Sequence, residues 1–208
     1  MIEKPDGNCK TESDTGDTCT IKKHITENKT LSKLRQGSEH PQNMKTDTRH
    51  LSIIPAYDHP QETAALFSEY TDMLVAGDSS FRKYLAIQHY DEELAHLETK
   101  YGLPGGRLYL AYCDGEPAGC IGLRKIDDKN CEMKRLYVRP QFRGQQIGNQ
   151  LIQKIIADAV EIGYSHMLLD TLPFLESALH MYRKFGFYEI ESYNDSPMSS
   201  SIFMRLDL

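Results

Sequence analysis

The segment from Val138 to Gly148, VRPQFRGQQIG, holds the residues of this chain that are best suited to bind an anion. A strand-like stretch passes through a loop containing Gly144 into apolar residues at helical spacing. The first amides of a helix have no partner inside it, and with the helix dipole they attract negative charge. A pyrophosphate suits such a site, and Arg143 would add positive charge. The alternative is a loop that needs glycine only for its backbone conformation.

Histidine and cysteine do not predict a metal site in this chain. His89 and His96 lie seven residues apart on a predicted helix, with Glu92 and Glu93 between them. This spacing does not match a zinc motif such as H-E-x-x-H, so we predict no metal. The five cysteines form no C-x-x-C pair, and their odd number does not suit a disulfide framework. We expect reduced thiols.

Two segments carry a resemblance to a known family. Arg143–Gly148, RGQQIG, resembles the R/Q-x-x-G-x-G/A acetyl-CoA loop of the GNAT N-acetyltransferases, and Ala178–Phe187, ALHMYRKFGF, resembles their late A-x-x-x-Y-x-x-x-G-F motif. The order of predicted strands and helices also matches, so the resemblance covers about residues 51–208. It implies an enzyme that transfers an acetyl group from acetyl-CoA to a primary amine by direct attack in a ternary complex.

The resemblance also implies where acetyl-CoA binds. Its pantetheine arm would pair with a strand that splays from the next strand, residues 167–171, and the thioester would enter the gap between them. A backbone N–H of the first strand could polarise the thioester oxygen. The implied cofactor residues are Leu136, Tyr137 and Val138 along the strand, and Arg143, Gly144, Gln145, Gln146, Ile147 and Gly148 in the loop.

Two proton transfers accompany this reaction, because alkyl amines are mostly protonated at neutral pH and a thiolate leaves best when protonated. The resemblance implies Glu132 as the general base, often through water, and Tyr182 as the general acid. The alternatives are that Glu132 pairs with a neighbouring Lys or Arg on the strand surface and that Tyr182 is a core aromatic residue. Arg124 and Lys134 could contact an anionic part of the substrate or could be solvated.

The sequence departs from the family pattern at two positions. Gln146 stands where the family usually has the middle glycine of its loop. This change is tolerable if residue 146 has ordinary helical φ and ψ angles in the first turn of the helix, and costly if its φ is positive. Leu175 stands where many members place an asparagine near CoA, which removes one polar contact.

The periodicity of apolar residues predicts the elements that hold these residues. The fold class that follows is α/β (α+β), with a GNAT-like mixed, largely antiparallel central sheet of about six to seven strands and helices on both faces. The predicted strands are 51–57, 107–113, 118–124, 131–138, 167–171, 187–193 and 201–206, and the predicted helices are 60–77, 81–101, 147–160 and 173–185.

Composition divides the chain into two parts. Residues 1–49 contain few apolar side chains and no sustained periodicity, so we predict a disordered tail that could recruit a partner, followed by one GNAT-like domain at 50–208. The sequence shows no signal-peptide apolar region and no apolar run long enough to span a bilayer. These features predict a cytoplasmic protein without a membrane partner.

The net charge of −6 bears on the partners. An acidic domain does not favour nucleic acid, and it suits an amine acceptor, either a small molecule or a peptide. The helical residues Tyr84, Tyr90, Asp91, Glu92 and Glu93 could bind a cationic amine or form a solvated face. Family members often form homodimers, so this assembly stays open. The competing functions are a non-catalytic acyl-CoA sensor or scaffold and a transferase that uses another acyl-CoA.

Overall fold

The computed structural model describes residues 50–79, 81, 90–194, 196 and 198–208. The predicted tail at 1–49 and much of the predicted second helix therefore lie outside the described residues. The elements are β1 (Leu51–Pro55), α1 (Pro60–Gly77), α3 (Tyr90–Ala95), α4 (Leu97–Tyr101), β2 (Arg107–Cys113), β3 (Glu116–Lys125), β4 (Asn130–Val138), the 3₁₀ turn η1 (Pro140–Phe142), α5 (Ile147–Ile162), β5 (His166–Thr171), α6 (Glu176–Lys184), β6 (Tyr188–Ile190) and β7 (Ile202–Asp207).

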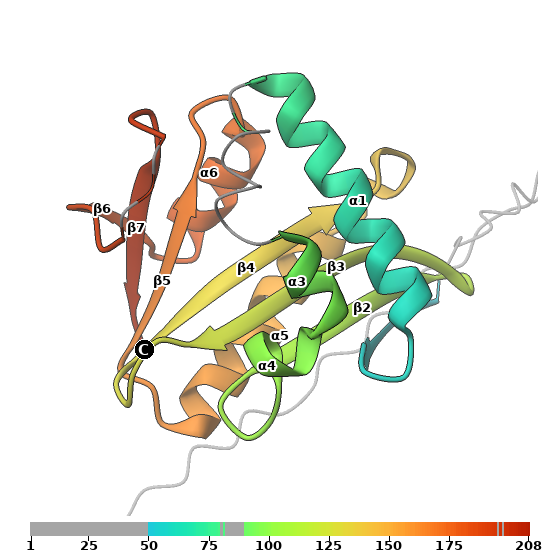
Figure 1. The fold of residues 1–208 in the computed structure, drawn as a ribbon, viewed down its shortest axis with the longest axis horizontal. Coiled ribbons are helices and arrows are strands. Elements are labelled where there is room, and N and C mark those ends of the chain that lie inside the picture. Colours follow the sequence, from blue (N-terminus) through green and yellow to red (C-terminus); the bar gives the residue numbers. More distant parts are fainter. Residues whose placement is uncertain (1–49, 80, 82–89, 195, 197) are drawn as a thin grey trace, which may run out of the picture. The chain divides into compact units, whose positions relative to one another are not determined.

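The strands form one seven-stranded sheet in the order β1-β2-β3-β4-β5-β7-β6. Among the strand pairs of the described residues, only β4 and β5 run parallel, and the other neighbours are antiparallel. Helices α1, α3 and α4 lie on one face and α5 on the other (Figure 1). The predicted mixed, largely antiparallel sheet with helices on both faces is confirmed.

The predicted helix at 81–101 is not continuous in its described part. Helix α3 ends at Ala95 and α4 begins at Leu97. His96 separates them, with φ −138° and ψ 58° outside the helical region, and its N–H donates to the carbonyl of Glu93. A single non-helical residue therefore turns the chain between two short helices.

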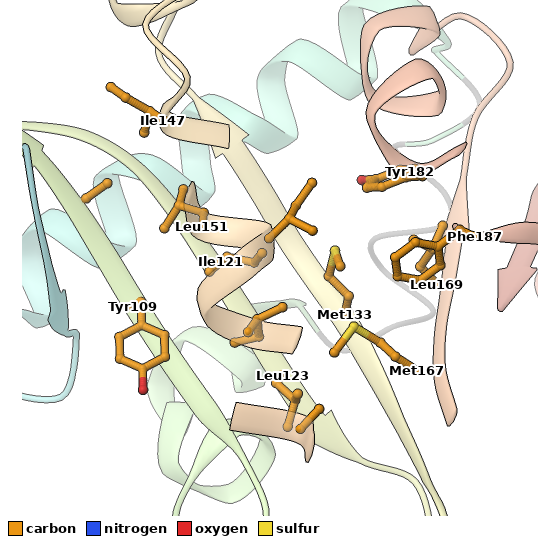
Figure 2. Packing of buried hydrophobic residues seen from close by; sticks show 14 of the residues in the cluster. Tyr109, Ile121, Leu123, Met133, Ile147, Leu151, Met167, Leu169, Tyr182 and Phe187 are labelled. Carbon is orange, nitrogen blue, oxygen red and sulfur yellow. The ribbon is translucent and has the colours of Figure 1, made fainter. Parts of the chain in front are cut away.

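Alternating side chains of the central strands supply the two halves of the core. Ile121, Leu123 and Met133 pack with α5, whose buried residues include Leu151 and Ile155 (Figure 2). Fully burying one such side chain stabilises the fold by roughly 1.5–3 kcal/mol. On the other face, a second cluster joins β2 and β3 to α1 and α4, with Leu66, Phe67, Tyr101, Leu108, Leu110 and Cys120 among its buried members.

A bulge at Arg135 reverses the alternation within β4. Arg135 has φ +58°, and the register with β3 shifts there. Before the bulge Met133 packs in the α5 cluster, whereas after it Leu136 and Val138 do. Tyr137 turns instead to the cluster on the opposite face. One extra residue therefore moves every later side chain of β4 to the other face.

Beyond this region β4 and β5 separate. Their pairing covers only Asn130 to Glu132 on β4 and His166 to Leu168 on β5. Figure 1 shows the two strands diverging from this common end. The backbone edge of β4 that follows Glu132 consequently has no strand neighbour on the β5 side.

Candidate active site

A cleft of about 680 Å³ lies where β4 ends, between α1, α6 and the start of α5. This volume is in the range of ligand sites, roughly 300–1,000 Å³. Gln145 is the predicted cofactor residue that does not line it, because its side chain accepts from the Cys113 thiol and donates to the Gln141 carbonyl. The predicted residues that line the cleft are Leu136, Tyr137, Val138, Arg143, Gly144, Gln146, Ile147 and Gly148.

The loop before α5 has the geometry of an anion site. Gly144 has φ +80°, a conformation that glycine adopts without steric cost. The first bond of the helix runs from the Gln150 N–H to the Gln146 carbonyl, so amides 147–149 have no acceptor within the helix. Amides that face an open cleft at a helix start can bind the phosphate groups of a nucleotide cofactor.

Gln146 has the positive φ that makes the departure from glycine costly. It is the N-cap residue of α5, with φ +62° and ψ 8°, in the left-handed region. That conformation costs a residue with a Cβ atom roughly 1–2 kcal/mol. The side-chain oxygen of Gln146 accepts from the side-chain amide of Asn149, which holds the Gln146 side chain at the helix start. Of the two conformations that the sequence left open, the structure has the strained one.

Arg143 lies at the mouth of the cleft. Its Nε donates to the Val138 carbonyl at 3.1 Å, and its terminal nitrogen lies 3.6 Å from the Met73 sulfur on α1. A second arginine fixes α1 beside the cleft, because Arg139 pairs bidentately with Glu69 at 2.7 and 2.9 Å. The guanidinium of Arg143 is therefore placed next to the free loop amides.

A smaller cavity of about 50 Å³, called here the inner chamber, lies in the gap between β4 and β5. It shares Tyr70, Leu136, Leu175 and Tyr182 with the cleft. Lys134, Arg135 and Asp170 supply charged groups to its wall. The wall also includes the buried apolar side chains of Leu74, Phe81, Leu172 and Met198.

Tyr182 lines both the cleft and the inner chamber. It is 7% exposed and packs against Phe187, with the ring centroids 5.8 Å apart. Figure 2 shows its hydroxyl directed away from Phe187. Burial raises the pKa of Tyr182, and the nearby Tyr70 and Asp170 raise it further. The phenol therefore stays protonated at neutral pH, as a proton donor requires.

Glu132 is completely buried and surrounded by hydrogen-bond donors. Arg124 donates to one carboxylate oxygen, and the Tyr193 hydroxyl donates to the other at 2.6 Å. Lys134 Nζ lies 3.4 Å from that second oxygen. The sequence offered Glu132 either as a general base or as a partner of a neighbouring Lys or Arg on the strand surface. These contacts match the pairing with cations, but Glu132 lies in the interior and not on the surface.

Lys134 links Glu132 to Asp170, a residue that sequence reasoning did not select. Its Nζ donates to Asp170 at 2.8 Å, and both side chains are nearly buried. Asp170 follows Leu169, which packs in the α5 cluster, so alternation along β5 directs Asp170 to the opposite face. A charged residue within a buried strand is the signal that could have identified it.

Glu93, which the sequence offered as a contact for a cationic amine, pairs within the protein. It accepts from Arg135 at 2.7 and 2.8 Å and from the Tyr101 hydroxyl at 2.7 Å. Burial raises the pKa of Glu93, but Arg135 and Lys100 outweigh it and lower this pKa to about 2. Tyr84 and the side chains of residues 90–92 lie outside the described residues.

Two properties of the described part of the chain bear on other functions. Within it, no group of three or more His, Cys, Asp or Glu side chains is arranged to hold a metal ion. No helix in the same part combines the length and apolarity needed to cross a membrane.

The splayed sheet and the loop at the start of α5 define a class of acyltransferase. Residues 66–187 match the model of the acetyltransferase (GNAT) family, and the chain belongs to this family. An uncharacterized N-acetyltransferase of Dictyostelium discoideum is 31% identical, over 76% of this chain and 99% of that protein. One of Schizosaccharomyces pombe is 40% identical, over 60% of this chain and 77% of that protein.

A solved structure supports the same fold. The PaiA N-acetyltransferase of Thermoplasma acidophilum, crystallised in complex with coenzyme A, aligns with a TM-score of 0.60 at 17% identity. The alignment covers 76% of this chain and 99% of that chain. At this identity the similarity establishes the architecture alone.

Proposed function

We propose that this protein transfers an acetyl group from acetyl-CoA to a primary amine by direct attack in a ternary complex. The observation that carries the proposal is the position of Tyr182, where the cleft of cofactor dimensions meets the inner chamber. A donor in the cleft and an acceptor in the chamber would meet beside its hydroxyl. Holding both reactants in one geometry supplies much of the rate enhancement in such a reaction.

The cleft offers a consistent place for each part of acetyl-CoA. The pyrophosphate would accept hydrogen bonds from the loop amides between Arg143 and Gly148, with the Arg143 guanidinium beside it. The pantetheine arm would lie along the β4 edge at Leu136 to Val138, which has no strand neighbour on the β5 side. A backbone N–H of this edge would polarise the thioester carbonyl.

Two side chains, Tyr182 and Glu132, are candidates for the proton transfers of the reaction. Tyr182, held in its protonated form by burial, would protonate the departing thiolate. Glu132 is the base that the family resemblance implies, and its contact with Lys134 connects it to the inner chamber. The chamber, with charged and apolar side chains on its wall, would accept the amine end of a small molecule or of a peptide.

Two other functions compete with this proposal. A sensor or scaffold that binds acyl-CoA without turnover would not need a buried tyrosine hydroxyl at the junction of two cavities, so Tyr182 favours the enzyme. A transferase for longer acyl groups would need a larger apolar space beyond β4. The inner chamber measures only about 50 Å³ and would hold the amine, so it leaves little room for a longer acyl chain.

The proposal is tested by titrating the protein with acetyl-CoA and CoA in a calorimeter and by measuring thiol release with a panel of primary amines. The panel comprises phenethylamine, spermidine, glycine and a tripeptide. We expect binding of both CoA forms and release of thiol with at least one amine. Tyr182→Phe should lower kcat by about 10²–10³-fold, because general acid catalysis contributes on the order of 10²–10⁴-fold.

The matched control is Tyr188→Phe, which removes the hydroxyl of an exposed tyrosine on β6. We expect this variant to keep the wild-type kcat. Binding of acetyl-CoA without turnover of any amine would support the sensor instead, and absence of binding would overturn the proposed function.

A further inference from the structure

Two carboxylates lie near the point where β4 and β5 diverge. Glu132 is in the last register pair of the two strands, opposite Leu168. Asp170 lies two residues further along β5, where the strands have separated. Lys134 contacts both carboxylates, at 3.4 Å from Glu132 and 2.8 Å from Asp170. The proton of the amine must reach one of them or water.

Glu132 is poorly placed to meet an amine. Its side chain has no exposed surface, and both of its oxygens accept from Arg124 or from the Tyr193 hydroxyl. An incoming amine would have to displace these donors and enter a space already filled by protein. Separating a buried carboxylate from two charge-assisted partners is costly, because such hydrogen bonds are stronger than neutral ones.

Asp170 is in the better position. Its side chain is 12% exposed and lines the inner chamber together with Tyr182 and Tyr70. Tyr182 and Tyr70 both sense its charge, because Asp170 contributes to raising the pKa of each. The carboxylate therefore lies on the wall of the cavity that also holds the proposed acid. Glu132 also contacts Lys134 but does not line this cavity.

We propose that Asp170 is the catalytic base of the acetyl transfer, accepting the proton of the attacking amine in the inner chamber while Lys134 holds its carboxylate. This inference rests on the proposed function. Glu132 then serves as the buried partner of Lys134 and Arg124 that fixes the position of the lysine.

The protons balance as follows. The ammonium form of the acceptor loses one proton to solvent, and the neutral amine attacks the thioester carbon to form the C–N bond. The nitrogen, now positively charged, gives its second proton to Asp170, which is a feasible transfer because such a nitrogen is acidic. The C–S bond breaks as Tyr182 protonates the sulfur, and Asp170 returns its proton to the Tyr182 phenolate. The products are an amide, the CoA thiol and one proton in solvent.

Charged and titratable groups face Asp170 from each neighbouring element. Lys134 comes from β4, Tyr70 from α1, Tyr182 from α6 and Tyr193 from the segment after β6. The ammonium group of Lys134 lies against the carboxylate at 2.8 Å and balances its charge, and burial keeps the tyrosines neutral.

The test compares variants on whichever amine of the panel the wild type acetylates fastest. Asp170→Asn should lower kcat by about 100-fold or more, within the range of general base catalysis, with unchanged affinity for acetyl-CoA by calorimetry. Asp170→Ala should lose a similar factor and regain at least tenfold on addition of formate, which supplies a small carboxylate to the vacated space. Asp128→Asn, at an exposed turn, is the matched control and should keep wild-type kcat.

Chemical rescue separates a base from a merely structural residue, because formate does not restore packing. If Asp170→Asn does not fold, the Asp170→Ala and Asp170→Glu variants carry the test, and displacement of the carboxylate by one methylene should cost at least tenfold. The inference is overturned if a folded Asp170→Asn keeps more than a tenth of wild-type kcat or if formate gives no rescue. A wild type that acetylates no amine overturns the proposed function as well.

Discussion

The cofactor cleft and the inner chamber differ in how far apart in the sequence their lining residues lie. Half of the residues that line the cleft belong to one segment, the end of β4, the loop and the first turn of α5, and the others come from α1 and from residues 174–182. The chamber depends on side chains from segments far apart in the sequence, among them Tyr70, Lys134, Asp170 and Tyr182. Backbone amides tolerate changes of side chain, whereas a cluster of charges depends on every member.

Two neighbouring residues of β4, Lys134 and Arg135, take part in two different buried ion pairs. Lys134 reaches Asp170 in the inner chamber, while Arg135 at the bulge reaches Glu93 in the interior. Arg135 also stacks over the Phe67 ring, 5.3 Å from its centroid. Both cations line the inner chamber, but Lys134 pairs there with Asp170, whereas Arg135 pairs with the buried Glu93.

The largest expected effect is on stability and comes from removing the buried pair between Arg135 and Glu93. Arg135→Met leaves the buried carboxylate of Glu93 without its main partner, and we expect a loss of about 3–5 kcal/mol in the free energy of unfolding. Urea denaturation measures it. The control Arg183→Met breaks an exposed pair with Glu189 and should cost less than about 1 kcal/mol. Equal losses in the two variants would contradict the structural role of Arg135.

The same pair predicts a pH dependence. The pKa of Glu93 is about 2 in the folded protein against an ordinary value of 4.5, so its stabilisation is present above pH 4.5 and is lost as the pH falls toward 2. The linked change is on the order of 3 kcal/mol. Denaturation at several pH values should show this loss in the wild type. In Glu93→Gln the slope over that interval should be smaller, and an unchanged slope would refute the assignment.

An intermediate effect is expected in the cofactor cleft. Arg143→Gln should weaken CoA binding by about tenfold, or ~1.4 kcal/mol, because one charge-assisted contact to the pyrophosphate is lost. Pantetheine lacks the pyrophosphate, so its affinity should not change. Calorimetric titration with both ligands measures the difference. A parallel loss for pantetheine would show that Arg143 supports the cleft in some other way.

The smallest effect concerns the strained start of α5. Gln146→Gly removes a Cβ atom at φ +62°, and we expect a gain of about 0.5–1 kcal/mol after the larger unfolded-state entropy of glycine is subtracted. Thermal unfolding followed by circular dichroism measures it. Gln145→Gly, one residue earlier, has no positive φ to relieve and should not stabilise the protein. Destabilisation by Gln146→Gly would mean that the contact with Asn149 outweighs the strain.

The sequence predicted the cleft more completely than the chamber. The resemblance of the glycine loop to the family motif implied nine cofactor residues, and eight of these residues line the cleft. Gln145 is the exception, because its side chain contacts Cys113. The sequence left the conformation of Gln146 open, since a left-handed residue with a Cβ atom gives no signal in composition or periodicity.

What the sequence determined by itself is the order of elements, the mixed sheet and the loop that precedes α5, because local periodicity and glycine placement encode them. Only the tertiary structure decided which carboxylate faces the chamber. The bulge at Arg135 shifts the register of β4, and the divergence of β4 from β5 exposes Asp170 while Glu132 stays enclosed. Such contacts depend on the relative placement of distant strands, which no local pattern records.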